Sequence, residues 1–110
     1  MIEKIVRDFL EEKLQLGVYL EVPKNENTFV VLEKTGSDEK NYLYSATIAV
    51  QSYGPSLYKA AQLNSQIIKV MEEIIELDEI SSCELNSDYN FTDTDTKKYR
   101  YQAVFDIVHY

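Results

Sequence analysis

The sequence predicts an α+β fold with the element order α-β-β-β-α-β-β, in which two helices pack on one face of a mainly antiparallel sheet. Two stretches carry apolar residues at helical spacing, one near the start of the chain and one after Gly54. Between and after them, apolar and polar residues alternate as in half-buried strands. The 110 residues have the length of one domain, so residues 1–110 are predicted to form a single domain. Its expected radius of gyration is about 13 Å.

The first half of the chain predicts one helix and two strands. A stripe of apolar side chains over residues 2–15 indicates an amphipathic helix, which Gly17 is expected to end. A short strand is expected over residues 18–22, and a second over residues 29–34, where β-branched residues are frequent. Residues 36–41 are polar and predict a loop.

The second half predicts three strands around the main helix. Residues 42–53 alternate in polarity and indicate a long half-buried strand. Gly54 and Pro55 end this strand and begin the main helix, whose apolar spacing continues to about Leu77. The remaining segments are a weaker strand over residues 80–85, a long polar loop over residues 86–98 and a last strand over residues 99–109.

Composition excludes several classes of function. Eleven Lys and Arg residues against 19 Asp and Glu residues give a net charge of −8, which argues against general nucleic-acid binding because that depends on a basic surface. The longest apolar run, over residues 29–32, is far shorter than the roughly 20 residues of a membrane-spanning helix. The first residues do not have the pattern of a signal peptide, and a single cysteine, Cys83, suits a reducing compartment. We therefore expect a protein of the cytoplasm with no membrane partner.

No group of residues predicts a catalytic, metal or cofactor site. His109 is the only histidine and Cys83 the only thiol, so one chain cannot assemble a zinc site or a nucleophile with an oriented base. Asp88, Asp93 and Asp95 are close in sequence, but the glycine and glutamate of a calcium-binding loop are missing. The three glycines are too far apart for a phosphate-binding loop. We therefore expect no enzyme and no cofactor; catalysis would need a site shared between subunits around His109.

Tyrosine and charge patterns predict protein interfaces instead. Tyrosine is enriched at interfaces, and several of the nine tyrosines fall near predicted strand ends, whereas Tyr44 and Tyr101 are expected in the core. Acidic residues gather at the end of the main helix, where the helix dipole disfavours them. Cations before the last strand are candidates to offset them, in the same or a neighbouring subunit; the alternative is a solvated acidic face. The candidate interface residues are Asp38, Glu39, Tyr53, Tyr58, Glu73, Glu76, Tyr89, Asp93, Asp95, Lys97, Lys98 and Arg100.

Three stretches of the chain resemble a known family. They are VLEKTG over residues 31–36, AVQSYG followed by SLY, AA and LN within residues 49–64, and YRYQAVF over residues 99–105. Together they resemble small tail-completion proteins of siphophages and prophages in Gram-positive bacteria, of the tail terminator group. The resemblance spans nearly the whole chain and implies a similar α-β-β-β-α-β-β layout. It carries no catalytic residue.

The resemblance also implies a function by assembly. Terminators of this group act as hexameric rings that cap a finished tail tube and join it to the head. The implied partners are further copies of the chain, the tail-tube protein and a head-completion or connector protein, with DNA only as passing cargo. The implied location is the host cytoplasm during assembly and then the head-proximal end of the virion tail.

Two other functions are open at this stage. One is a head-completion or connector adaptor, which would contact the portal side of the joint. The other, from a different class, is a small cytoplasmic module that binds a ligand or a peptide in a groove beside the main helix. For either phage role, the two polar loops over residues 36–41 and 86–98 are expected to become ordered on meeting the tube or the connector.

Overall fold

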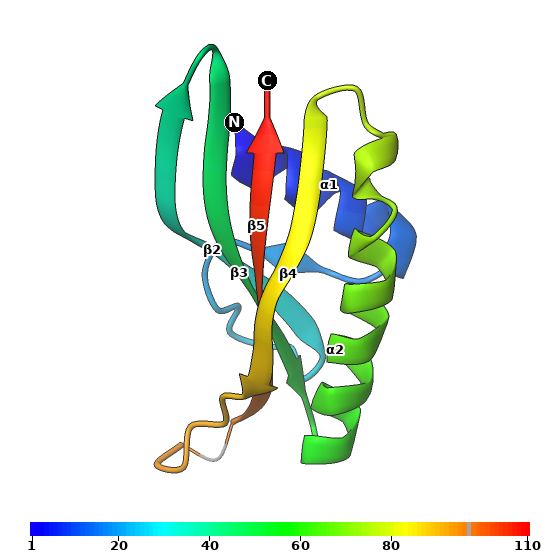
Figure 1. Ribbon diagram of the computed structural model, residues 1–110. Coiled ribbons are helices and arrows are strands. Elements are labelled where there is room, and N and C mark those ends of the chain that lie inside the picture. The colour runs from blue at the N-terminus through cyan, green and yellow to red at the C-terminus, as the bar shows by residue number, and fades with distance from the viewer. Residues whose placement is uncertain (97) are drawn as a thin grey trace.

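A single five-stranded sheet, in the strand order β1-β2-β3-β5-β4, forms the framework of the fold (Figure 1). The computed structural model describes residues 1–96 and 98–110. Its elements are α1 (Ile2–Leu14), β1 (Val18–Tyr19), β2 (Phe29–Lys40), β3 (Leu43–Gly54), α2 (Leu57–Met71), the 3₁₀ helix η1 (Ile74–Glu76), β4 (Ile80–Asn90) and β5 (Tyr99–His109). The predicted α+β class and element order are confirmed.

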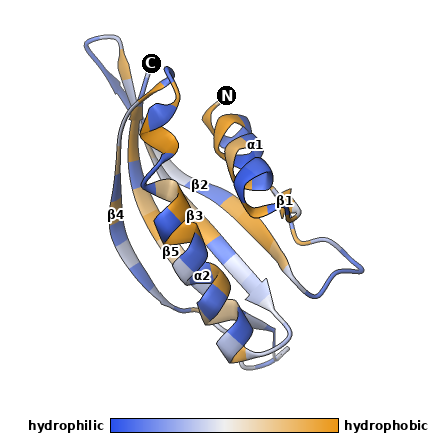
Figure 2. Cartoon of the chain, turned by 90° about the vertical axis from the view of Figure 1, so that its right-hand side faces the viewer, coloured by the Kyte–Doolittle hydropathy of each residue, from blue (hydrophilic) through white to orange (hydrophobic). Residues whose placement is uncertain are grey.

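The sheet is mainly antiparallel, as predicted. Among the described residues only β1 pairs in parallel, with two residues of β2, whereas the β2–β3, β3–β5 and β4–β5 pairs are all antiparallel. Both helices lie on the same side of the sheet (Figure 2). The molecule measures 44 × 25 × 22 Å, and its radius of gyration of 13.7 Å is close to the expected value. Its long axis follows the strands, which gives the molecule two distinct ends.

The core lies between the two helices and one face of the sheet. Alternate residues of β2, β3 and β5 point into it, as the period-two pattern requires. Its fully buried members include Val6 and Leu10 of α1, Ile67 and Met71 of α2, Val30, Ile48 and Val50 of the first long hairpin, and Ala103 and Ile107 of β5. The remaining residues of these strands form the opposite face, which carries no helix and is called the helix-free face below.

Both helices end differently from the prediction. α1 ends at Leu14, and the C-cap residue Gln15 adopts the left-handed conformation with φ 54°, so Gly17 is not the C-terminal glycine of the helix. α2 begins after Ser56, whose side chain accepts a hydrogen bond from the Lys59 backbone N–H, and it ends at Met71 rather than near Leu77. The chain then tightens into η1, which places Ile74 in the core while the acidic side chains around it stay in solvent. None of the helices within residues 1–96 and 98–110 is long and apolar enough to cross a membrane.

The predicted loop over residues 36–41 is wrong, because residues 36–40 continue β2 and only Asn41 of this range lies in a turn. After a register shift between Lys34 and Gly36, the strand pairs with β3 as far as Lys40 opposite Leu43. Asn41 and Tyr42 form a two-residue turn with φ of 54° and 66°, the backbone signs of a type I′ hairpin. Backbone pairing with β3 therefore extends a polar segment that has no apolar face of its own.

Two further segment boundaries are corrected. The strand expected over residues 18–22 contains only Val18 and Tyr19, because the chain bends at residues 20–21. The loop expected over residues 86–98 is shorter than predicted, because β4 continues to Asn90 in register with β5. The rest of this connection is tied down by backbone hydrogen bonds from Phe91 to Arg100 and from Asp93 to Lys98.

Gly54 provides a test of how closely β3 approaches α2. A Cβ at this position would lie 2.8 Å from the backbone nitrogen of Ala60, whereas a Cβ at Gly36 would meet nothing within 4 Å. We expect Gly54→Ala to lower the free energy of unfolding by about 1–3 kcal/mol through overpacking. Gly36→Ala is the matched control, expected to be neutral or stabilising by up to about 1 kcal/mol. Urea unfolding measures both; equal effects of the two substitutions would contradict the close approach.

Candidate functional site

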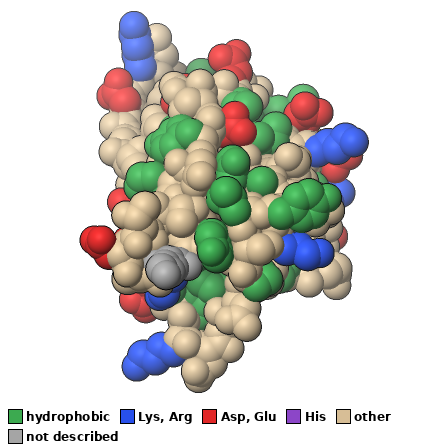
Figure 3. All heavy atoms as spheres, turned by 90° about the horizontal axis from the view of Figure 1, so that it is seen from below, with side chains coloured by type: hydrophobic (Ala, Val, Ile, Leu, Met, Phe, Trp, Pro, Cys, Tyr) green, Lys and Arg blue, Asp and Glu red, His purple; other side chains and the backbone are tan. Residues whose placement is uncertain are grey.

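Most of the predicted interface residues lie at the lower end of the sheet in Figure 1, at the ends of β3 and β4 and the start of β5. The end of β3, the start of β5 and residues 22–27 enclose a pocket of about 320 Å³, called the basal pocket here. Its lining includes Val22, Pro23, Lys24, Phe29, Tyr53, Pro55, Lys98 and Tyr99. Seen from below, hydrophobic side chains gather across this end of the molecule, with both basic and acidic side chains around them (Figure 3). The basal pocket thus combines aromatic and proline side chains with polar groups, among them Glu26, Lys24 and Lys98.

Tyr53 belongs to the interior of this end and not to its surface. Its ring stacks on Phe29 with the centroids 4.5 Å apart, and Tyr19 packs edge-on against the same phenylalanine. The contact role predicted for Tyr53 stays a prediction, but in the single chain Tyr53 is only 3% exposed. The physical reason is the register of β2 and β3, which pairs the two aromatic residues on the helix-free face.

The Arg100 side chain links β3 to the residue that follows β4 through two hydrogen bonds. Its Nε–H donates to the Phe91 carbonyl oxygen at 2.6 Å, and its Nη1 donates to the Tyr53 hydroxyl at 2.9 Å. The guanidinium carbon lies 4.5 Å from the centroid of the Phe91 ring, within the range of a cation–π interaction. The predicted interface role of Arg100 therefore competes with contacts that the side chain already makes within its own chain.

A chain of polar side chains crosses the helix-free face beside Arg100. Gln51 donates through Nε2 to Oε1 of Gln102 at 2.9 Å, and Gln102 donates through Nε2 to the Tyr89 hydroxyl at 2.5 Å. Both glutamines are buried although no helix covers them. Tyr89 is 42% exposed and packs edge-on against Phe91, so this predicted contact residue lies at the surface in a fixed orientation.

Asp93 and Asp95 lie in the connection between β4 and β5. Asp93 accepts hydrogen bonds from the backbone N–H groups of Asp95 and Thr96, at 2.9 Å and 3.4 Å. These donors, the Asp95 N–H foremost, hold the pKa of the Asp93 carboxyl below its ordinary value. Asp93 thus stabilises the turn, and Asp95 is exposed beside it. Across residues 1–96 and 98–110, no three His, Cys, Asp or Glu side chains are grouped to hold a metal ion.

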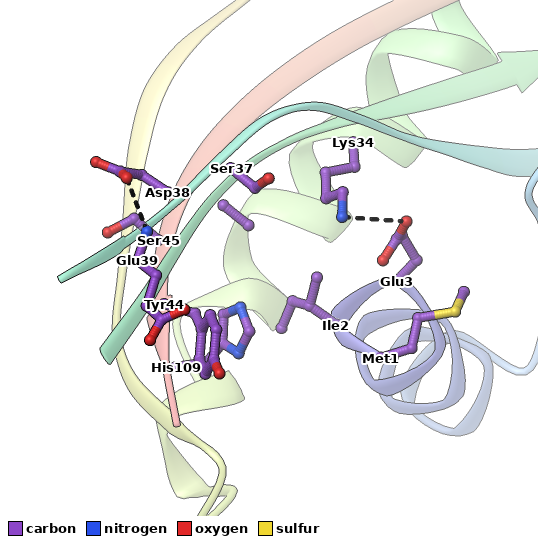
Figure 4. A pocket seen from close by; sticks show the side chains of 11 residues that line it. Met1, Ile2, Glu3, Lys34, Ser37, Asp38, Glu39, Tyr44, Ser45 and His109 are labelled. Atoms are coloured by element: carbon purple, nitrogen blue, oxygen red, sulfur yellow. Dashed lines mark hydrogen bonds and ion pairs between the residues drawn. The ribbon is translucent and has the colours of Figure 1, made fainter. Parts of the chain in front are cut away.

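The upper end of the molecule has a second hollow, shown in Figure 4. This upper pocket has a volume of about 420 Å³ and lies between the start of α1 and the β2–β3 hairpin, with Asp38 and Glu39 on its rim. Tyr44 stacks on His109 at one side, with a centroid separation of 5.5 Å, and on the other side Lys34 Nζ is 3.8 Å from Glu3 Oε2. Tyr44 is 43% exposed, so its predicted place in the core is wrong, whereas Tyr101 is half-buried on the helix-covered face.

Lys98 and Arg100, the two described cations before and at the start of β5, do not form the predicted pairing with the acidic end of α2 within a subunit. α2 runs upward from its start, so Glu73 and Glu76 lie at the upper end, whereas Lys98 and Arg100 lie at the lower end (Figure 1). Glu73 Oε2 is instead 3.9 Å from Lys13 Nζ. Lys97, the third predicted cation, lies outside the described residues. Tyr58 is 72% exposed at the start of α2, which leaves its predicted contact role open.

No family model and no curated protein matches the chain. The surfaces formed by the described residues are therefore the basis for inferring the function. They include two differently lined ends and a polar, uncovered sheet face, which are surfaces for contact.

Sequence reasoning missed Tyr42, the most exposed large hydrophobic residue of the protein at 91%. It occupies the second position of the β2–β3 turn with φ 66°, a conformation that favours glycine. The signal was present in the sequence, because Asn41 and Tyr42 stand between two segments whose lengths match across a hairpin. It was hidden by the absence of glycine, since Asn-Gly is the usual mark of this turn.

Arg100 is expected to be a stabilising residue that lysine cannot replace. Arg100→Lys keeps the charge but cannot bridge the Phe91 carbonyl and the Tyr53 hydroxyl with a planar fork. We expect Arg100→Lys and Arg100→Ala each to lower the free energy of unfolding by about 1–2 kcal/mol. The exposed neighbour Lys98→Ala, the control, should change it by less than about 0.5 kcal/mol. If urea unfolding gives Arg100→Lys the same free energy of unfolding as the wild type, the stabilising role of these two hydrogen bonds is contradicted.

Cys83 is expected to react slowly in the folded protein. Burial against the core raises the pKa of its thiol to about 11, with smaller contributions from Asp106 and Glu84. At pH 8 we expect a thiol reagent to modify the folded chain far more slowly than the unfolded chain.

The raised pKa of the Cys83 thiol also predicts how the free energy of unfolding changes with pH. The unfolded thiol ionises near pH 9 and the folded one near pH 11, so the folded state keeps a proton that the unfolded state has lost. The free energy of unfolding should therefore fall more steeply between pH 9 and 11 in the wild type than in Cys83→Ala. Parallel pH profiles of the two proteins would contradict this assignment.

Proposed function

We propose that this protein is a structural, non-enzymatic tail-completion protein of a siphophage or prophage, which caps the finished tail tube as a ring and joins it to the head. Its partners in this role are further copies of itself, the tail-tube protein and a head-completion or connector protein. It acts in the host cytoplasm during assembly and then remains at the head-proximal end of the tail, with DNA as passing cargo.

One observation carries the proposal: the three segments that resemble tail terminators are neighbours in space. Residues 31–36 lie in β2, residues 49–64 run from β3 into α2, and residues 99–105 lie in β5. The sheet register joins them directly, since Val31 pairs with Gln51 and Gln51 pairs with Gln102. The resemblance therefore covers one continuous part of the sheet and the helix that follows β3.

The surfaces of the molecule support a role in assembly. A subunit that joins two structures needs contact surfaces at two ends, and the basal and upper pockets give the two ends different linings. The helix-free face carries exposed acids, among them Glu33, Glu84 and Asp106, and the net charge is −8. An acidic surface keeps a passing DNA duplex from adhering, because like charges repel.

Native mass and tube capping test the proposal together. We expect light scattering to show a concentration-dependent step to six subunits, ring-shaped in the electron microscope, and we expect the protein to cap the ends of isolated tail tubes. A charge-reversed variant, Glu73→Lys with Glu76→Lys, tests whether the acidic end of α2 contributes. If it does, assembly should weaken and lose part of its salt dependence.

Other outcomes point to the alternatives. Rings that bind portal-side connectors and leave tail tubes uncapped would favour the head-completion adaptor. A stable monomer or dimer that binds a small molecule or peptide and ignores both tubes and connectors would favour a ligand-binding module. Either result would overturn the terminator role.

A further inference from the structure

The tip of the β2–β3 hairpin carries an aromatic residue that the fold does not need. Tyr42 is 91% exposed, and it takes a left-handed conformation that is unfavourable for any residue with a bulky side chain. Glycine at this position would form the same turn without strain. A strained and exposed aromatic residue at the end of a hairpin is typical of a contact with a partner.

The opposite end of the same molecule contains a hollow suited to an aromatic ring. The basal pocket, of about 320 Å³, is lined by Phe29, Tyr53 and Tyr99 together with two prolines. Phe29 and Tyr53 are held in place by their mutual stacking, so the floor of the pocket is already formed. An aromatic residue that enters a preformed pocket with aromatic walls is a usual centre of a protein interface.

Tip and pocket cannot meet within one chain. Strand β2 begins with Phe29 in the pocket and ends with Lys40 beside the tip. Its 12 residues span about 36 Å at the usual rise of a strand, most of the 44 Å length of the molecule. Figure 1 shows the β2–β3 turn at the upper end of the molecule and the start of β5, where the pocket lies, toward the lower end. Any contact between these two surfaces is therefore a contact between two copies.

The charges around the two surfaces are complementary. Asp38 and Glu39 precede the tip and are exposed, and with Lys40 they leave the tip with a net charge of −1. Lys24 and Lys98 line the basal pocket and are exposed as well. The one acid of the pocket lining, Glu26, accepts the hydrogen bond of the Tyr19 hydroxyl. An acidic tip thus faces a cationic rim when two copies meet end to end.

We propose that Tyr42 of one copy inserts into the basal pocket of a second copy. The upper end of each subunit then contacts the lower end of the next subunit. Because the two surfaces differ, every copy offers one tip and one pocket, and repeated contacts close into a ring or continue as a filament. Closure at six subunits rests on the proposed function, whereas the contact itself does not.

Sedimentation of two single variants tests the contact. Tyr42→Gly removes the ring and relieves the strained backbone, so we expect a higher melting temperature together with self-association at least about tenfold weaker. Tyr99→Ser opens the pocket wall from the other side and should weaken association to a similar extent. Tyr110→Gly, which removes another exposed tyrosine (67%), is the control and should associate like the wild type.

Mixing the two variants distinguishes a head-to-tail contact from a symmetric one. The tip of Tyr99→Ser and the pocket of Tyr42→Gly are intact, so an equal mixture has one good interface per pair. We expect the mixture to form heterodimers and nothing larger. Larger assemblies in the mixture, or no heterodimer at all, would overturn the proposal.

The remaining outcomes separate this inference from the proposed function. If Tyr42→Gly associates and caps tail tubes like the wild type, the inference is wrong and the terminator role stands. If the wild type shows no self-association at the highest concentration, the inference is wrong whatever the tubes show. If the wild type associates through Tyr42 and leaves tubes uncapped, the inference stands and the terminator role is wrong.

Discussion

The register of β3 against its two neighbours is the constraint on which the rest of the structure depends. β3 pairs with β2 on one side and with β5 on the other along almost its whole length. A slip of one residue would turn Ile48 and Val50 out of the core and replace them by Ala49 and Gln51. The same register sets Phe29 beside Tyr53 and Gln51 beside Gln102, so it determines the core, the basal pocket and the polar chain across the helix-free face together.

A chain of 110 residues with two helices covers only one face of a five-stranded sheet, so the other face has to be stable against water by itself. It achieves this with side chains that bond to one another across strands. The two buried glutamines satisfy each other and Tyr89, and Arg100 connects Tyr53 to the Phe91 carbonyl. Buried polar groups that are hydrogen-bonded cost less than unpaired ones, and they fix strand positions more narrowly than apolar contacts do.

The sequence was sufficient for the fold class and the element order, because apolar periodicity reports which residues face a core. It failed where pairing with a neighbouring strand decides the structure. Residues 36–40 have no apolar face, and only hydrogen bonding to β3 makes them a strand. The candidate site was harder, since tyrosine at a strand end predicts burial and contact equally well. Tyr53 became buried because Phe29 lies opposite it, a long-range pairing that no local pattern reveals.

The residues that look most suited to binding a partner therefore already make contacts within their own chain. Arg100, Tyr53 and Gln102 would each be attractive in an interface, but their polar atoms are engaged within the chain. A partner gains most from groups that are exposed in the free subunit and that make no contribution to its stability. Tyr42 fits this description, because the turn would be more stable with glycine in its place. A residue that lowers the stability of its own subunit and is nevertheless fully exposed makes sense when its favourable contacts form only in the assembly.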